Sequence, residues 1–167
     1  MLGHPLLIPI PDIDRTDFML ILGANPLASN GSLTTAAGVK RRLEDIKKRG
    51  GKIVLIDPRR TETMTISSEH HFVRPGTDVF LLLAMLEVIF SENLVKLGRL
   101  EEFTDGLEVL REAVHGFTPE RVSARTGLNA STIRQLARDF AAAPSAVAYG
   151  RIGLSTQAFG GSSQWLV

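Results

Sequence analysis

The sequence predicts an α/β fold: a Rossmann-like, doubly wound and mainly parallel sheet with helices on both faces and a helical insertion. Two runs of strand length, 17–22 and 53–56, carry this prediction, because strands without polar alternation are typically buried on both faces. Between these runs, apolar residues recur at helical spacing. Strand, helix and strand in this succession form a βαβ unit with a right-handed crossover.

The first half of the chain is expected to build the core of the sheet. Gly23 closes the first strand, and the stretch 24–32, rich in Asn, Pro, Ser and Gly, predicts a loop. Ser32 is the expected N-cap of the next helix, which ends before Gly50-Gly51. The apolar face of this helix is formed by Ala36, Val39, Leu43 and Ile46.

The second strand stops at Asp57-Pro58, and residues 72–74 predict a short third strand that Pro75-Gly76 ends. A strong helix follows over about 78–92. The segment 101–142 is expected to be mostly helical, and a last strand over 146–149 closes in Gly150. The predicted helices of that segment are 107–114, 119–125 opened by Thr118, and 131–142 opened by Asn129.

Composition excludes several kinds of site. The chain has 167 residues, a net charge of +1 and no cysteine. A disulfide framework, a thiolate nucleophile and a cysteine-ligated metal or iron–sulfur centre are therefore excluded from this sequence. The length suits one domain over 1–167, and the near-zero charge gives no signal for nucleic acid or a membrane surface.

No membrane or export segment is expected. The longest apolar run, 79–86, is too short for a bilayer, which needs about 20 residues. The apolar stretch 2–10 is interrupted by prolines and lacks a basic leader, so a cytoplasmic location is predicted. Both ends of the sequence lack a stop signal, and we expect a piece of a longer polypeptide.

Candidate functional residues follow the strands, because doubly wound sheets bind ligands at the carboxyl ends of their strands. Gly23-Ala24-Asn25-Pro26 joins a strand to a helix; glycine admits a ligand to the backbone, and free amides there favour phosphate. The motif matches neither the dinucleotide fingerprint nor the P-loop. An ordinary connecting loop with local turns is the alternative explanation.

Two further segments contain acids at strand ends. Asp57 occupies the place where dinucleotide folds hold a ribose, and Arg59 and Arg60 beside it suit phosphate. The alternative is a turn cap with solvated arginines. In the segment 74–78, Asp78 can accept from two neighbouring N–H donors of guanine, whereas the alternative is a helix N-cap at Thr77 or Asp78.

Metal and catalytic sites are not predicted. His70-His71 are adjacent, so on a strand they point to opposite faces and do not chelate together easily. The segment 118–138 resembles a helix-turn-helix that would present Arg134, Gln135 and Arg138 to DNA; a helical hairpin packed on the sheet is the alternative.

Three motifs occur in order and at sensible spacing: ILGANP at 21–26, VLIDPRRTET at 54–63 and VRPGTD at 73–78. With these the chain resembles the molybdopterin oxidoreductases, the formate dehydrogenases, nitrate reductases and dimethyl sulfoxide reductase relatives. Later stretches, TPE at 118–120, TGL at 126–128 and YGRIG at 149–153, also look like that family. The resemblance covers nearly the whole chain.

The resemblance implies an internal domain that holds the molybdenum cofactor, a bis(molybdopterin guanine dinucleotide), by one guanosine diphosphate arm. Its partners would be the other pterin-binding domains of the same polypeptide and electron-transfer subunits. The molybdenum ligand and any iron–sulfur cluster would lie outside this stretch, so no turnover is expected from it alone. The implied cofactor-binding residues are Gly23, Ala24, Asn25, Ser29, Asp57, Pro58, Arg59, Gly76, Thr77 and Asp78.

Two other functions stay open on the sequence. A free-standing Rossmann-like nucleotide-binding domain would want a glycine fingerprint that the sequence lacks. A DNA-binding regulator would use the hairpin at 119–140, but a net charge of +1 gives it little electrostatic support.

Overall fold

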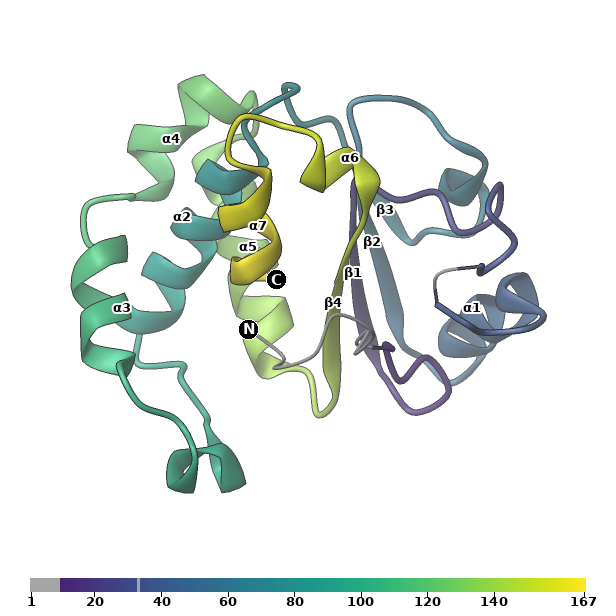
Figure 1. Ribbon diagram of the computed structural model, residues 1–167, viewed down its shortest axis with the longest axis horizontal. Coiled ribbons are helices and arrows are strands. Elements are labelled where there is room, and N and C mark those ends of the chain that lie inside the picture. Colours follow the sequence, from purple (N-terminus) through teal and green to yellow (C-terminus); the bar gives the residue numbers. More distant parts are fainter. Residues whose placement is uncertain (1–9, 33) are drawn as a thin grey trace.

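Four strands form one all-parallel sheet in the order β3-β2-β1-β4 in the computed structural model, which describes residues 10–32 and 34–167 (Figure 1). Strand β1 lies inside the sheet and pairs with both β2 and β4. The α/β class and the parallel sheet are therefore confirmed. The strands are β1 Phe18–Leu22, β2 Lys52–Ile56, β3 Glu69–His71 and β4 Ala146–Gly150.

Helices cover both faces of the sheet, as the doubly wound fold requires. Helix α1 lies on one face, and the other helices gather on the opposite side, with α2 and α5 packed together there (Figure 1). The α-helices are α1 Val39–Lys48, α2 Asp78–Ser91, α3 Leu107–Val114, α4 Pro119–Thr126, α5 Ala130–Ala142, α6 Ile152–Ser155 and α7 Gly160–Leu166. Two short 3-10 helices are η1 Glu62–Thr65 and η2 Gly98–Glu102.

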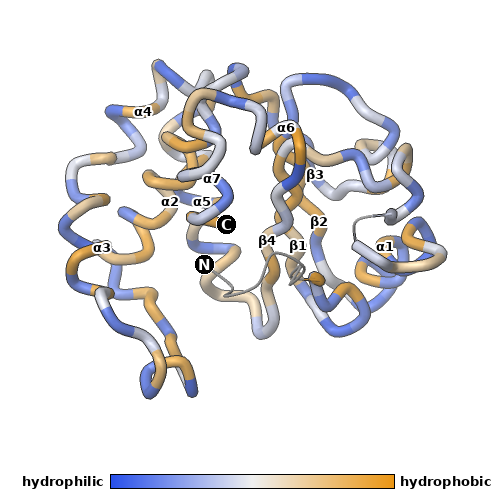
Figure 2. Tube along the Cα trace, viewed as in Figure 1, coloured by the Kyte–Doolittle hydropathy of each residue, from blue (hydrophilic) through white to orange (hydrophobic). Residues whose placement is uncertain are grey.

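The strands separate two hydrophobic cores. Side chains alternate along a strand, so Leu20 and Leu22 face the helices α2 and α5, whereas Met19 and Ile21 face α1. All five residues of β1 are buried. Figure 2 shows the hydrophobic residues concentrated along the strands and the adjoining helices. Burial on both faces explains why the apolar runs show no polar alternation.

One predicted helix start is wrong. Helix α1 begins at Val39, not just after Ser32, and Gly38 occupies its N-cap position with a φ of 65°. Thr35 also has a positive φ, of 47°. Left-handed backbone at these two positions cannot continue a right-handed helix, so the chain turns before α1 begins. The apolar face is otherwise as expected, because Val39, Leu43 and Ile46 are buried.

The third strand is displaced from its predicted position at 72–74. It comprises Glu69–His71, which pairs with Val54 through Ile56 of β2. Beyond it the chain leaves the sheet, because the Arg74 amide donates to the Thr126 carbonyl of α4 at 2.9 Å. Val73 is still buried, in the core beside α2. Contact with a helix thus replaces ladder hydrogen bonds over the predicted stretch.

The helical segment 101–142 packs on α2. Both α4 and α5 contact α2, and buried Val122, Ile133 and Leu136 join the core on that face. Among the described residues, no helix combines the length and the apolarity that crossing a bilayer requires. The prediction that the chain has no export leader concerned the stretch 2–10. Most of this stretch lies outside the described residues.

Candidate functional site

The loops that were predicted to carry function share one edge of the sheet. The strands are parallel, so their carboxyl ends meet there, at the upper edge in Figure 1. The chain passes from β1 to β2 on one side and later returns to β4 on the other. The order of strands therefore reverses between β1 and β4, and this switch point is the usual ligand crevice of such sheets.

Two glycines meet at the switch point. Gly23 follows β1 with a φ of 55°, and a Cβ there would lie 2.5 Å from the Leu154 amide nitrogen. A Cβ on Gly153 would lie 2.7 Å from the Gly23 carbonyl oxygen, which accepts a 3.0 Å hydrogen bond from the Gly153 amide. Only residues without a side chain allow this approach, so the two loops are held together where the strand order reverses.

Asn25 ties the first loop to the second. Its Nδ2 donates to Glu62 at 2.6 Å, and its Oδ1 accepts from the Thr63 hydroxyl at 2.7 Å. The bond from Asn25 lowers the pKa of the Glu62 carboxyl. Both ends of the Asn25 amide are therefore engaged within the protein, and the contribution of this loop to a ligand would come from its backbone.

The other predicted residues of this loop lack a free polar side chain in the crevice. Ala24 is buried in the core beside α1. The Ser29 amide donates to the Asn25 carbonyl at 3.1 Å, and its hydroxyl donates to the Pro26 carbonyl at 3.5 Å. Ser29 thus closes a local turn, which is the behaviour expected of an ordinary connecting loop.

Asp57 follows β2 and is nearly buried. Its Oδ1 accepts from the Arg59 amide at 2.8 Å, which forms a turn around Pro58. The His70 ring nitrogen lies 3.0 Å from the Asp57 carbonyl oxygen. Pro58 and Arg59 are exposed. The second segment thus presents one carboxylate at the edge of the sheet, with a guanidinium next to it in the chain.

Asp78 is the more deeply buried of the two predicted acids at this edge. It opens α2, only 2% of its surface is exposed, and its Oδ2 has no hydrogen-bond partner among the described residues. Burial raises the pKa of the Asp78 carboxyl, the Gln157 side chain lowers it, and the negative charge of Asp57 raises it. A buried, incompletely satisfied acid that senses a second acid is typical of a functional site.

The turn before Asp78 is shaped by Gly76, whose φ is 80°. Thr77 stands at the N-cap position of α2 but makes no capping bond; its hydroxyl donates instead to the Arg74 carbonyl at 2.6 Å. The cap position was predicted correctly, whereas the expected cap hydrogen bond is absent. Asp78 is the acid of the first turn of α2, a position where a carboxylate also interacts favourably with the helix dipole.

Two residues at this edge were not among the predicted site residues. Gln157 lies beside Asp78 and donates to the Gly153 carbonyl at 2.5 Å. Arg151 follows β4, and its Nε is buried without a partner among the described residues. The sequence indicated the loop after Gly150 as a whole. It contains no motif that would single out Arg151 and Gln157 from the other polar residues of that loop.

The three side chains that a helix-turn-helix would present to DNA already form hydrogen bonds within this chain. Arg134 donates to Glu120 at 2.9 Å, Arg138 donates to Glu92 at 2.8 Å, and Gln135 bonds to its own helix. The cations that would read bases are held by acids of this chain. The structure thus favours the alternative, a helical hairpin packed on the sheet.

Metal ligands do not cluster in the part of the chain that the structure describes: no three His, Asp or Glu side chains are placed to share an ion. The adjacent histidines have separate partners. His71 contacts Glu69 at 3.0 Å, whereas His70 contacts the Asp57 carbonyl.

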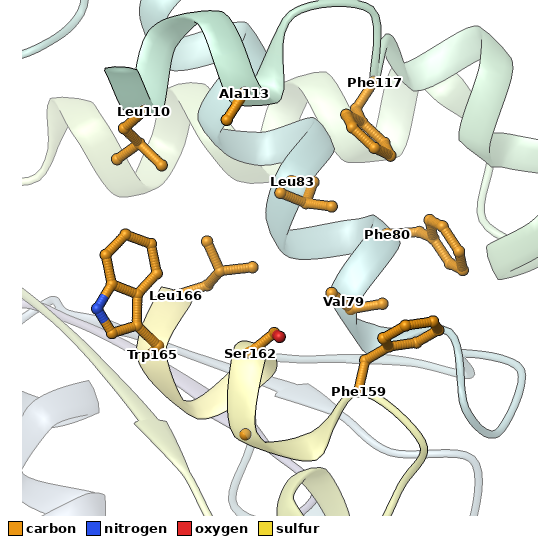
Figure 3. Close-up of a pocket in the computed structure, with 11 residues that line it drawn as sticks. Val79, Phe80, Leu83, Leu110, Ala113, Phe117, Phe159, Ser162, Trp165 and Leu166 are labelled. Carbon is orange, nitrogen blue, oxygen red and sulfur yellow. The ribbon is translucent and has the colours of Figure 1, made fainter. Parts of the chain in front are cut away.

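A large apolar groove lies apart from the carboxyl edge. It has a volume of about 800 Å³ and lies between α2, the α3 region and α7, as Figure 3 shows. Trp165 and Phe159 on its wall are each more than half exposed. No charged side chain lines the groove, so it offers nothing to a phosphate. It is lined by Val79, Phe80, Leu83, Leu110, Ala113, Phe117, Phe159, Gly161, Ser162, Trp165 and Leu166.

Known proteins resemble this chain over most of its length. The profile of the family described as Molybdopterin oxidoreductase matches residues 5–158. Formate dehydrogenase H of Escherichia coli (strain K12) is 38% identical over 146 residues, which is 87% of this chain and 20% of that protein. F420-dependent formate dehydrogenase subunit alpha of Methanocaldococcus jannaschii is 36% identical over 129 residues, 77% of this chain and 18% of that protein.

A solved structure shows the same architecture. Acetylene hydratase from Pelobacter acetylenicus superposes with a TM-score of 0.81 at 27% identity, covering 94% of this chain and 21% of that one. The chain thus spans about a fifth of the length of the relatives that it matches.

Proposed function

This chain belongs to the molybdopterin oxidoreductase family, and from that premise we propose that it grips the guanosine diphosphate arm of a bis(molybdopterin guanine dinucleotide) cofactor. The observation that carries the proposal is the pair of acids Asp57 and Asp78 at the carboxyl edge, where a buried oxygen of Asp78 has no partner within the described part of the chain. Guanine offers two adjacent N–H donors and ribose offers two hydroxyls. Carboxylates accept from both kinds of donor.

The residues present at the edge fit such a group. An unsatisfied buried carboxylate oxygen costs about 1–3 kcal/mol, and a ligand donor would remove that cost. The first loop, including Gly23, Ala24, Asn25 and Ser29, would line the diphosphate and ribose through its backbone. Asp57 with Pro58 and Arg59, and the turn Gly76, Thr77 and Asp78, would complete the nucleotide pocket.

When bound, the cofactor supplies the redox chemistry of a molybdenum centre. The role of this chain is to bind and orient one arm of it. The longer relatives suggest that other domains of the same polypeptide, and electron-transfer subunits, complete an oxidoreductase. An iron–sulfur cluster would also lie outside this chain, which contains no cysteine. We expect no turnover from the chain alone.

The proposal is tested by measuring the affinity of the chain for GDP and, separately, for ADP, which carries adenine in place of guanine. We expect weak binding that prefers GDP, and a loss of about tenfold in affinity in Asp57→Asn or Asp78→Asn, the scale of one charge-assisted hydrogen bond. Inosine diphosphate lacks the guanine 2-amino group and 2′-deoxy-GDP lacks one ribose hydroxyl. If a variant binds inosine diphosphate as well as it binds GDP, the substituted acid contacts the guanine 2-amino group. If it binds 2′-deoxy-GDP as well as GDP, the substituted acid contacts the ribose 2′-hydroxyl.

Asp105→Asn removes an exposed acid away from the carboxyl edge and serves as the matched control. Asp78→Asn should fold, because a neutral amide avoids the burial that raises the pKa of this carboxyl. Equal affinity for GDP and ADP that neither substitution changes would contradict the proposed pocket.

A further inference from the structure

Arg151 lies at the end of β4, on the other side of β1 from Asp57. We infer that Arg151 is an anion-binding residue that holds the phosphate groups of the nucleotide arm, and so sets the direction in which that arm crosses the sheet. The inference rests on the proposed function, because it assigns a ligand to the same edge. Arg151 lies within the family-like stretch YGRIG at 149–153, but the predicted cofactor-binding residues did not include it.

The backbone of Arg151 is fixed from both sides. Its amide donates to the Leu22 carbonyl at 3.2 Å, which joins it to the end of β1. Its carbonyl accepts from the Leu154 amide at 2.8 Å and from the Gln164 side chain at 3.2 Å. The residue therefore stands on a rigid support at the switch point, as an effective binding residue requires.

The side chain points toward the β1–α1 loop. Arg151 keeps extended backbone, with φ −140° and ψ −158°, so it lies on the same face of the strand as Tyr149, two residues earlier. Tyr149 belongs to the core on the α1 side. Consistently, one terminal nitrogen of Arg151 lies 3.5 Å from the hydroxyl of Ser32 in that loop.

The guanidinium has unused binding capacity. Among the described residues its Nε is buried without a hydrogen-bond partner, the guanidinium makes one long hydrogen bond, to Ser32, and it forms no ion pair. By contrast, Arg134 and Arg138 pair with acids and Arg74 donates to a carbonyl of α4 at 2.7 Å, whereas Arg59 and Arg60 are exposed to solvent. A partly buried guanidinium with a free edge matches the geometry of a phosphate.

Charge across the edge matches the polarity of a nucleoside diphosphate. Asp57 and Arg151 follow β2 and β4, which flank β1, so their backbones are separated by two strand spacings, about 10 Å. Donors of the base and ribose would meet the acids, and the negative phosphates would meet Arg151. The opposite orientation would bring the phosphates to Asp57 and Asp78, where the exposed Arg59 and Arg60 would have to offset both carboxylates, and it would leave Arg151 without an anion.

The test compares Arg151→Gln with wild type in titrations with guanosine, GMP, GDP and inorganic pyrophosphate, followed by amide chemical shifts. In wild type, affinity should rise with each phosphate, and pyrophosphate should shift the amides of Ser32 and Arg151. In the variant, the ratio of the affinity for GDP to the affinity for guanosine should fall about tenfold, whereas the affinity for guanosine should stay within about twofold of the wild-type value. Arg151→Lys should retain part of the preference for GDP, because it keeps the charge without the planar fork.

Arg41→Gln is the matched control, since it removes a charge from an exposed position on α1 and should leave every affinity unchanged. An unchanged ratio of GDP to guanosine in Arg151→Gln, or no pyrophosphate binding to wild type, would overturn the inference. These outcomes are separate from failure of the proposed function, which would appear as equal affinity for GDP and ADP. Loss of diphosphate affinity for both bases in Arg151→Gln, without base preference, would support Arg151 and contradict the guanine pocket.

Discussion

Gly23 shows how a single residue at this edge is constrained twice. Its φ of 55° belongs to the left-handed region, and the backbone of Gly153 and Leu154 occupies the space that a Cβ would need. The first constraint is one of conformation and the second is one of packing between two loops. The sequence indicated a glycine at a strand end, but the contact with a residue 130 positions later is visible only in the folded chain.

Replacing Gly23 by Ala should destabilise the protein by about 2–4 kcal/mol, because strain at positive φ and a backbone clash add together. Gly161→Ala is the control: this glycine lies in α7 with open space around it. There the change should be neutral or stabilising by up to about 1 kcal/mol. Urea unfolding measures both. Equal midpoints for the two variants would show that the switch-point contact is not tight.

Among the elements, β3 depends on contacts that the local sequence does not reveal. Lys52 at the start of β2 binds Glu69 of β3 and Asp139 of α5, each at 2.7 Å. Burial lowers the pKa of Lys52, but the bonds to Asp139 and Glu69 raise it more. The bond from Lys52 lowers the pKa of Glu69, and it also keeps that of Asp139 low despite burial. This cluster joins an edge strand to the helical layer.

Lys52→Met should cost about 0.5–1 kcal/mol near pH 7, a modest value because these groups are partly solvated. The folded-state pKa values of Glu69 and Asp139 are lowered, so their contribution is present above the ordinary carboxyl range and is lost as the pH falls through the folded-state values. The difference in free energy of unfolding between wild type and variant should therefore shrink between pH 7 and pH 3.

Chemical denaturation at a series of pH values measures that difference. Lys47→Met, an exposed change on α1, provides the comparison and should show no such pH dependence. A stability difference for Lys52→Met that is equally large at both ends of the range would exclude the ion pairs as its source.

The whole molecule is built around one sheet whose strands supply both cores. Leu20 of β1 belongs to the core beside α2, and Met19 belongs to the core beside α1. Opening either core would expose one face of the strands on which the other core is also built. The helical segment 101–142 joins the first core through Val122 and Ile133 rather than forming a core of its own.

The chain is therefore expected to unfold as one domain over 1–167. Trp165, the single tryptophan, reports on α7, whereas far-UV circular dichroism reports on all helices and strands. Their thermal midpoints should coincide, and the calorimetric and van't Hoff enthalpies should agree. Two separate transitions would instead indicate that the helical segment and the sheet unfold independently.

Much of the fold could be predicted from local pattern. Strand β1, the helix α2 and the helices of the 101–142 segment lie within a residue or two of their predicted positions, because buried strands and amphipathic helices leave strong signals. The errors concern connections. Residues 72–74 leave the sheet because α4 takes the Arg74 amide, and residues 32–38 turn because Thr35 and Gly38 adopt positive φ.

The sequence by itself determined the α/β class, the parallel sheet, the family, and which loops follow the strands at the carboxyl edge. Each of these follows from periodicity, composition and short ordered motifs. Only the tertiary structure decided which polar side chains are already hydrogen-bonded within the protein and which still have an unused donor or acceptor. It engages the Asn25 amide, and over residues 10–32 and 34–167 it gives no hydrogen-bond partner to the buried Asp78 Oδ2 and Arg151 Nε. Burial and hydrogen bonding depend on residues that are distant in sequence, so no local pattern encodes them.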